Sequence, residues 1–137
     1  MAKFETNDPK KMAQHIKKAL DAQVAETLIT VQARLGSTRV SPYQTGRFRS
    51  SWFASEGSPS GDVAPEGTDS PNTDASGLKV DSSKTYHLTN SLPYAQLICL
   101  EGRATSKPAN WFTDFRDQAI PEIQKDAAKL VKKVMDL

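Results

Sequence analysis

The sequence predicts a single α+β domain: a long N-terminal helix and a kinked C-terminal helix pack on a small, mostly antiparallel β-sheet, with a long Ser/Gly/Pro-rich insert. Three observations predict this class. Apolar residues recur at helical spacing near both ends of the chain. Short runs in the middle alternate between apolar and polar residues, which is the period of a strand. The length of 137 residues fits one domain, here taken as 1–137.

The first helix is predicted to begin after Asn7 or Asp8, with Pro9 in its first turn, and to end at Gly36. Its apolar stripe consists of Met12, Ile16, Leu20, Val24, Leu28, Val31 and Leu35. Such a helix is roughly 40 Å long at 1.5 Å per residue, which exceeds what a small domain needs. It therefore either covers one sheet or also packs against a neighbouring subunit.

A strand is predicted over residues 47–53, after a turn that contains Pro42 and Gly46. The alternation places Phe48, Ser50 and Trp52 on an inner face and Arg47, Arg49 and Ser51 on an outer one. We expect Gly46 to adopt a positive φ, which other residues resist. The pattern fits an ordinary edge strand with solvated arginines, and it also fits a cationic face with a binding role.

An acidic insert is predicted over residues 54–84. It holds three of the eight prolines and four of the seven glycines, and six Asp/Glu against two Lys. A connection of this length and composition is either disordered or ordered by a partner, with short extended pieces near 62–64 and 78–81. Residues 1–53 carry nine Lys/Arg against four Asp/Glu, so the two regions suggest self-complementary contact or an anionic partner.

The rest of the chain predicts one more strand and two helices. Residues 84–90 alternate as a strand, and 91–93 turn the chain. Tyr94, Leu97 and Ile98 then have the spacing of a short helix that ends at Gly102, although a strand over 95–100 is the alternative. Asn110 caps a final helix, which Pro121 should kink or divide. Its expected stripe is Phe112, Phe115, Ala119, Ile123, Ala127, Leu130 and Val134.

Motifs for catalysis are few. The chain has two histidines, His15 and His87, and one cysteine, Cys99, so local Cys/His zinc spacing is excluded. Asp114 and Asp117 could share a metal on one helix, but a solvated helical face is the favoured interpretation. No Gly-rich phosphate loop follows a strand, and there is no nucleophile elbow. We therefore expect no enzyme activity, no cofactor and no metal.

The basic residues allow a weaker kind of binding. Arg34, Arg39, Arg47 and Arg49 form a basic cluster that could attract phosphate non-specifically through counterion release. The N-terminus does not resemble a signal peptide, and no apolar run approaches 18 residues. We expect a protein without a membrane segment that stays in the cytosol unless it leaves within a larger particle.

Two blocks of the sequence carry a family resemblance. Ser41-Pro42, followed by Thr45-Gly46-Arg47-Phe48-Arg49-Ser50-Ser51-Trp52, resembles the T-P-V-D-T-G-R-L-R-N-S-W signature of tailed-phage head–tail joining proteins, also called tail-completion or neck proteins. Thr89-Asn90-Ser91-Leu92-Pro93-Tyr94-Ala95, ending in Leu100-Glu101-Gly102, is similar to that family's N-x-x-P-Y-A…E-x-G block. The order of elements also agrees over about residues 10–135.

The resemblance implies a virion protein without catalytic activity, assembled in the host cytoplasm. Such subunits form rings, commonly hexameric, that join the capsid portal or adaptor to the tail around the DNA channel. A band of Arg47 and Arg49 would then face either DNA in the lumen or an acidic patch of a neighbour, such as the insert. The alternatives are a tail-terminator cap on the tail tube and a small non-specific nucleic-acid-binding protein. Candidate interface or channel residues are Arg39, Pro42, Thr45, Gly46, Arg47, Arg49, Trp52, Asn90, Pro93, Tyr94, Glu101 and Gly102.

Overall fold

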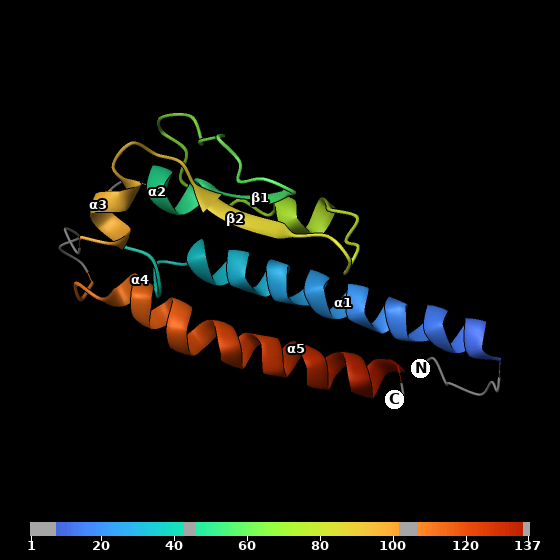
Figure 1. The fold of residues 1–137 in the computed structure, drawn as a ribbon. Coiled ribbons are helices and arrows are strands. Elements are labelled where there is room, and N and C mark those ends of the chain that lie inside the picture. The colour runs from blue at the N-terminus through green and yellow to red at the C-terminus, as the bar shows by residue number, and fades with distance from the viewer. Residues whose placement is uncertain (1–7, 43–45, 102–106, 136–137) are drawn as a thin grey trace.

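A computed structural model describes residues 8–42, 46–101 and 107–135. The elements are α1 (Pro9–Leu35), α2 (Gly46–Ser50), β1 (Trp52–Glu56), η1 (Asp74–Gly77), β2 (Tyr86–Asn90), α3 (Ala95–Cys99), α4 (Trp111–Asp114), η2 (Phe115–Ala119) and α5 (Ile120–Met135). In Figure 1 the long helix α1 runs between α5 on one side and the two-stranded sheet on the other, while α2, α3 and α4 gather at one end. The α+β class predicted from the sequence is confirmed.

Helix α1 has the predicted boundaries. The Asp8 side chain accepts a hydrogen bond from the Lys10 backbone N–H at 2.9 Å, Pro9 opens the helix, and Gly36 follows its last residue. Only the C-terminal half of the predicted apolar stripe is buried, as Leu28, Val31 and Leu35. The N-terminal half, formed by Met12, Ile16 and Leu20, remains 37, 50 and 48% exposed.

The predicted strand over 47–53 is wrong at its first residues, because 46–50 form the helix α2 and the strand begins at Trp52. Phe48 and Trp52 are four residues apart, so burying both is compatible with a helical turn as well as with alternation. The Ser50 and Ser51 hydroxyls donate to the carbonyls of Gly46 and Arg47, both at 2.7 Å. These bonds to the residue four positions earlier fit a helical turn.

The sheet consists of β1 and β2, which pair antiparallel from Trp52 opposite Asn90 to Glu56 opposite Tyr86. The predicted second strand is therefore confirmed. Lys84, two residues before Tyr86, forms an ion pair with Glu56 at 3.0 Å. The segment after Pro93 is the helix α3 rather than a strand, which decides between the two alternatives for 95–100.

The C-terminal helix contains a π-helical turn, η2, in front of Pro121. Proline lacks the backbone N–H that would bond four residues back, and its ring crowds the preceding turn, so an interruption at this point has a local cause. The residues that face the core agree with the predicted stripe at Phe115, Ile123 and Ala127 and differ from it elsewhere. Trp111, Phe115, Ile123, Ala127 and Val131 are buried at spacings of four or eight, whereas the predicted stripe residue Leu130 is 48% exposed.

The acidic insert lies against its own chain. Its first residues, Ala54–Glu56, belong to β1, and its alanines Ala64 and Ala75 are 4 and 2% exposed. One buried contact is made by Gln32 of α1, which is 2% exposed. Its Nε2 donates to the Trp52 carbonyl at 3.0 Å and to the Asp74 carboxylate, and its Oε1 accepts from the Ala75 N–H at 3.0 Å. Short extended pieces near 62–64 and 78–81 do not form strands.

Candidate functional site

The two arginines of the first motif block bind the acidic insert of the same chain. Arg49 donates to the Asp69 carbonyl at 2.7 Å and carboxylate at 2.9 Å, and to the Gly36 carbonyl at 3.0 Å. Arg47 donates to the Ala64 carbonyl at 2.8 Å and lies 3.9 Å from Glu66. Their side chains are 16 and 25% exposed. The predicted cationic strand face is therefore absent, and both arginines have partners within the subunit.

Gly46 is needed because Asp69 approaches it closely, and the positive φ predicted for this residue is wrong. It is the first residue of α2, whereas the left-handed backbone among the described glycines belongs to Gly57 (φ 84°) and Gly67 (φ 85°). A Cβ at Gly46 would lie 2.1 Å from the Asp69 Oδ1 and 2.4 Å from the Asp69 Cα. Glycine therefore allows the acidic insert to approach closely enough for Asp69 to reach Arg49.

Other motif residues brace the same region. Asn90 donates from Nδ2 to the Phe48 carbonyl at 2.8 Å, which ties the end of β2 to α2. Pro42 is less than 2% exposed, and Trp52 is 4% exposed. Tyr94 precedes α3 and packs against the core, whereas Pro93 and Glu101 are exposed. Thr45 and Gly102 lie outside the described residues.

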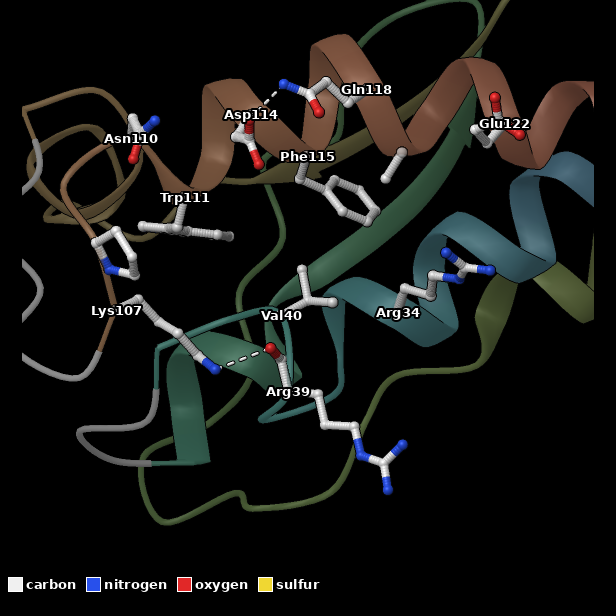
Figure 2. A pocket seen from close by; sticks show the side chains of 12 residues that line it. Arg34, Arg39, Val40, Lys107, Asn110, Trp111, Asp114, Phe115, Gln118 and Glu122 are labelled. Atoms are coloured by element: carbon white, nitrogen blue, oxygen red, sulfur yellow. Dashed lines mark hydrogen bonds between the residues drawn. The ribbon is translucent and has the colours of Figure 1, made fainter.

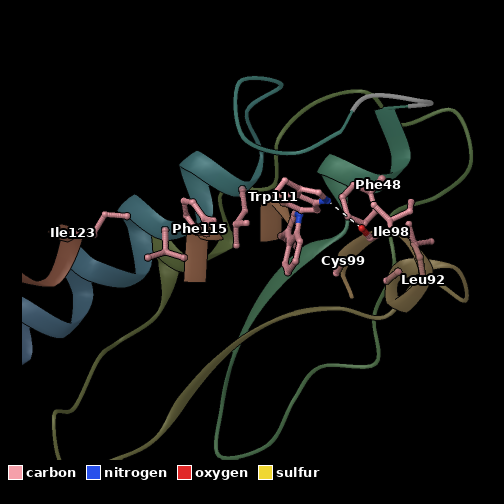
Figure 3. Packing of buried hydrophobic residues seen from close by; sticks show 11 residues of the cluster. Phe48, Leu92, Ile98, Cys99, Trp111, Phe115 and Ile123 are labelled. Atoms are coloured by element: carbon pink, nitrogen blue, oxygen red, sulfur yellow. Dashed lines mark hydrogen bonds between the residues drawn. The ribbon is translucent and has the colours of Figure 1, made fainter. Parts of the chain in front are cut away.

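An aromatic cluster joins the two motif blocks to the C-terminal helix. Phe48 packs edge-on against both Trp52 and Trp111, with ring centroids 5.9 and 6.1 Å apart, and Trp52 stacks on Phe112 at 5.9 Å. Figure 3 shows Trp111 directed toward α3, where its Nε1 donates to the Ile98 carbonyl at 3.0 Å. The Trp52 Nε1, by contrast, is buried and has no hydrogen-bond partner among the residues that the structure describes. The motif aromatics therefore hold the fold together.

Cys99 belongs to the same cluster. Its side chain is 7% exposed, and burial raises the pKa of the thiol to about 12 from an ordinary value of 9.0. A thiol that stays protonated at neutral pH is a poor nucleophile and a poor metal ligand. Cys99 is therefore a packing residue.

A basic cleft of about 600 Å³ lies where the end of α1 meets α4 and η2. Figure 2 shows its cationic side chains, Arg34, Arg39 and Lys107, on one side and the carboxylates of Asp114 and Glu122 on the helix opposite. Lys107 donates from Nζ to the Arg39 carbonyl at 2.8 Å. Within the described residues neither Arg34 nor Arg39 forms an ion pair. The predicted four-arginine cluster is thus divided: Arg47 and Arg49 are bound to the acidic insert, whereas Arg34 and Arg39 line the cleft.

A second hollow, the apolar groove, lies between β2, α3 and α4 at the same end of the molecule. Its volume is about 300 Å³, and it is lined by Trp52, Leu88, Thr89, Asn90, Ala95, Gln96, Cys99, Leu100 and Phe112. Leu97 and Leu100 of the adjoining segment are 38 and 57% exposed. An opening of this chemistry can accept apolar side chains from another molecule.

Each of the two aspartates considered for a metal binds a neighbouring side chain of its own helix. Asp114 accepts a hydrogen bond from Gln118 at 2.7 Å, and Asp117 pairs with Arg116 at 2.9 Å. The hydrogen bond from Arg116 lowers the pKa of Asp117. Across residues 8–42, 46–101 and 107–135, no three His, Cys, Asp or Glu side chains are grouped so as to hold a metal ion. In that same part of the chain, no helix has the length and apolar character to cross a membrane.

Sequence reasoning missed two residues, Gln32 and Lys107. A buried glutamine inside an apolar helical stripe could have been noticed, because Gln32 lies between Val31 and Leu35 on the face toward the core. Lys107 gave no local signal, since its link to Arg39 spans 68 positions.

No family model, curated protein or solved structure matches this chain.

Proposed function

We propose that this chain is a structural subunit of a tailed-phage virion, without catalytic activity, that assembles into a ring at the neck and joins the portal or adaptor to the tail around the DNA channel.

 The proposal rests on the two motif blocks together with the large apolar side chains that the fold leaves uncovered. Met12, Ile16 and Leu20 form one exposed row, and Leu97 and Leu100 flank the apolar groove. Exposed apolar surfaces of this kind mark sites of protein–protein contact.

The internal contacts of the motif residues support an assembly role in a second way. Arg47, Arg49 and Asn90 are bound to groups of their own chain. These residues therefore stabilise the fold, and the fold in turn positions the apolar surfaces that face outward. A fold of this kind suits a protein whose work is to join other proteins.

The test is association with virion components. The purified protein is mixed with portal complexes and with tail tubes, and binding is followed by co-sedimentation and electron microscopy of the junction. We expect a collar of this chain between the two assemblies. A protein that binds neither assembly, and is missing from the junction of the assembled particle, contradicts the proposal.

The basic cleft supports a second candidate, non-specific nucleic-acid binding. Arg34, Arg39 and Lys107 are the residues to change, and exchange of all three for alanine is expected to weaken a gel shift at low salt. Lys125, Lys129 and Lys132 on α5 provide a charge-matched control triple, because they are exposed and lie outside the cleft. Equal binding by the two triples would exclude the cleft as the site.

A further inference from the structure

The N-terminal half of α1 carries an exposed row of apolar residues, which we call the ridge. It consists of Met12, Ile16 and Leu20, spaced four residues apart on one face of the helix. Four lysines lie between Pro9 and Leu20, and no acidic residue does. One of them, Lys17, pairs with Asp21 and Asp81 of the same chain at 3.1 and 3.0 Å, which leaves Lys10, Lys11 and Lys18 as the cations beside the row. The ridge is therefore a convex apolar surface within a basic stretch of helix.

The apolar groove lies at the opposite end of the molecule. Arg34, near the C-terminal end of α1, lines the same cleft as Trp111 of α4, and Met12 is 22 positions earlier, or roughly 33 Å along the helix. Figure 1 shows this separation, with α3 and α4 at one end and the start of α1 at the other. One copy of the chain therefore cannot place its own ridge in its own groove.

The groove differs from the ridge in charge as well as in shape. Residues 86–101, which form most of its lining, contain no Lys or Arg, and Glu101 is exposed directly after Leu100. A concave apolar surface with an acidic residue at its border complements a convex apolar surface with lysines beside it. The two surfaces are complementary to each other rather than each to itself.

We propose that the ridge of one copy docks in the apolar groove of the next copy. A contact between two unlike surfaces is heterologous, so it continues from subunit to subunit until the rotation closes a ring. This inference rests on the proposed function, since it names the interface from which the neck ring is built. It also explains why α1 extends past the sheet: the overhanging turns belong to the neighbour.

The size of the ridge sets the expected strength of one contact. Stable interfaces bury about 800 Å² per partner, more than three side chains can supply. A single ridge–groove contact is therefore weak, and ring closure or a portal surface stabilises the assembly. The assay must detect a weak contact, and covalent trapping does so.

The first experiment is disulfide trapping between copies. In a Cys99→Ala background, Ile16→Cys protein is mixed with Leu97→Cys protein and oxidised. We expect a disulfide-linked dimer of the two variants. Lys18→Cys replaces Ile16→Cys as the matched control, because Lys18 is exposed on the same helix but outside the ridge. Equal yields from both pairs, or no mixed dimer, overturn the proposal.

The second experiment uses complementation at high protein concentration. Ile16→Glu removes the ridge but keeps the groove, and Leu100→Glu does the reverse. We expect each variant alone to be monomeric and the mixture to form a one-to-one dimer that cannot grow, measured by analytical ultracentrifugation. Self-association of Leu100→Glu alone would mean that two ridges pair, and persistent monomers in the mixture would mean that the ridge and the groove do not bind each other. Either result overturns the inference.

These outcomes are separate from the fate of the proposed function. A mixed disulfide in a protein that binds neither portal nor tail would support the ridge–groove interface and contradict the proposed function at the neck. A collar at the neck without the mixed disulfide would support the proposed function and contradict the ridge–groove interface. Circular dichroism of each variant shows that it is folded.

Discussion

The close approach of the acidic insert to Gly46 leads to a sharp prediction for Gly46→Ala. The added Cβ would lie 2.4 Å from the Asp69 Cα, whereas ordinary contacts begin near 3.4 Å, so the backbone at Asp69 must move by about 1 Å. Overpacking of this kind costs about 1–3 kcal/mol. Weakening the bonds from Arg49 to the half-exposed Asp69 adds about 0.5 kcal/mol to this loss of stability. Alanine lowers the conformational entropy of the unfolded chain, which stabilises the folded state by a similar amount.

The expected net loss of stability is therefore about 1–3 kcal/mol, or a fall in Tm of roughly 4–12 °C for a chain of this size. Thermal unfolding followed by circular dichroism measures it. Gly61→Ala is the matched control, because a Cβ there meets nothing within 4 Å, and its Tm should change little. Equal Tm values for the two variants would refute the argument. Asp69→Gly combined with Gly46→Ala should show a non-additive recovery, since it removes two of the three close contacts.

Three further predictions follow from buried and titrating groups. Gln32→Leu leaves the Trp52 carbonyl and the Ala75 N–H without this partner, and should cost about 2–4 kcal/mol in urea unfolding, whereas Gln14→Leu on the exposed surface should cost little. The Cys99 thiol should react slowly with a thiol reagent at pH 8 until the protein unfolds, because burial raises its pKa to about 12. The raised pKa also means that the contribution of this thiol to the free energy of unfolding is present below pH 9 and is lost as the pH rises from about 9 through about 12. The Ser82 N–H lowers the pKa of Asp21, and the Ser83 hydroxyl and N–H lower the pKa of Asp81. The stability that these carboxylates supply is therefore present above about pH 4 and is lost in more acidic solution. Amide chemical shifts of these two serines should stay constant from neutral pH down to about pH 4, because the lowered pKa values keep both carboxylates ionised there. Shifts that titrate with a midpoint at or above about pH 4 would contradict the contacts.

The long elements were predictable because their signals are local. The apolar spacing and the Asp8–Pro9 pair define α1, the alternation of Tyr86 and Leu88 defines β2, and Pro121 marks the interruption of the C-terminal helix. Each of these signals acts within a few residues of the chain, through backbone dihedrals, caps and side-chain period. The same signals were sufficient for the α+β class.

The site depended on contacts that no local pattern contains. Phe48 and Trp52 have a spacing that fits a helical turn as well as an alternating strand, so packing decided between them. Arg47 and Arg49 meet partners 17 and 20 positions away, which makes them internal anchors of the acidic insert instead of an outer cationic face. The sequence by itself determined which segments are helices and strands of an α+β domain. Only the tertiary structure decided which charges are neutralised within the subunit and which apolar residues remain exposed, because burial and ion pairing depend on distances between segments far apart in the chain.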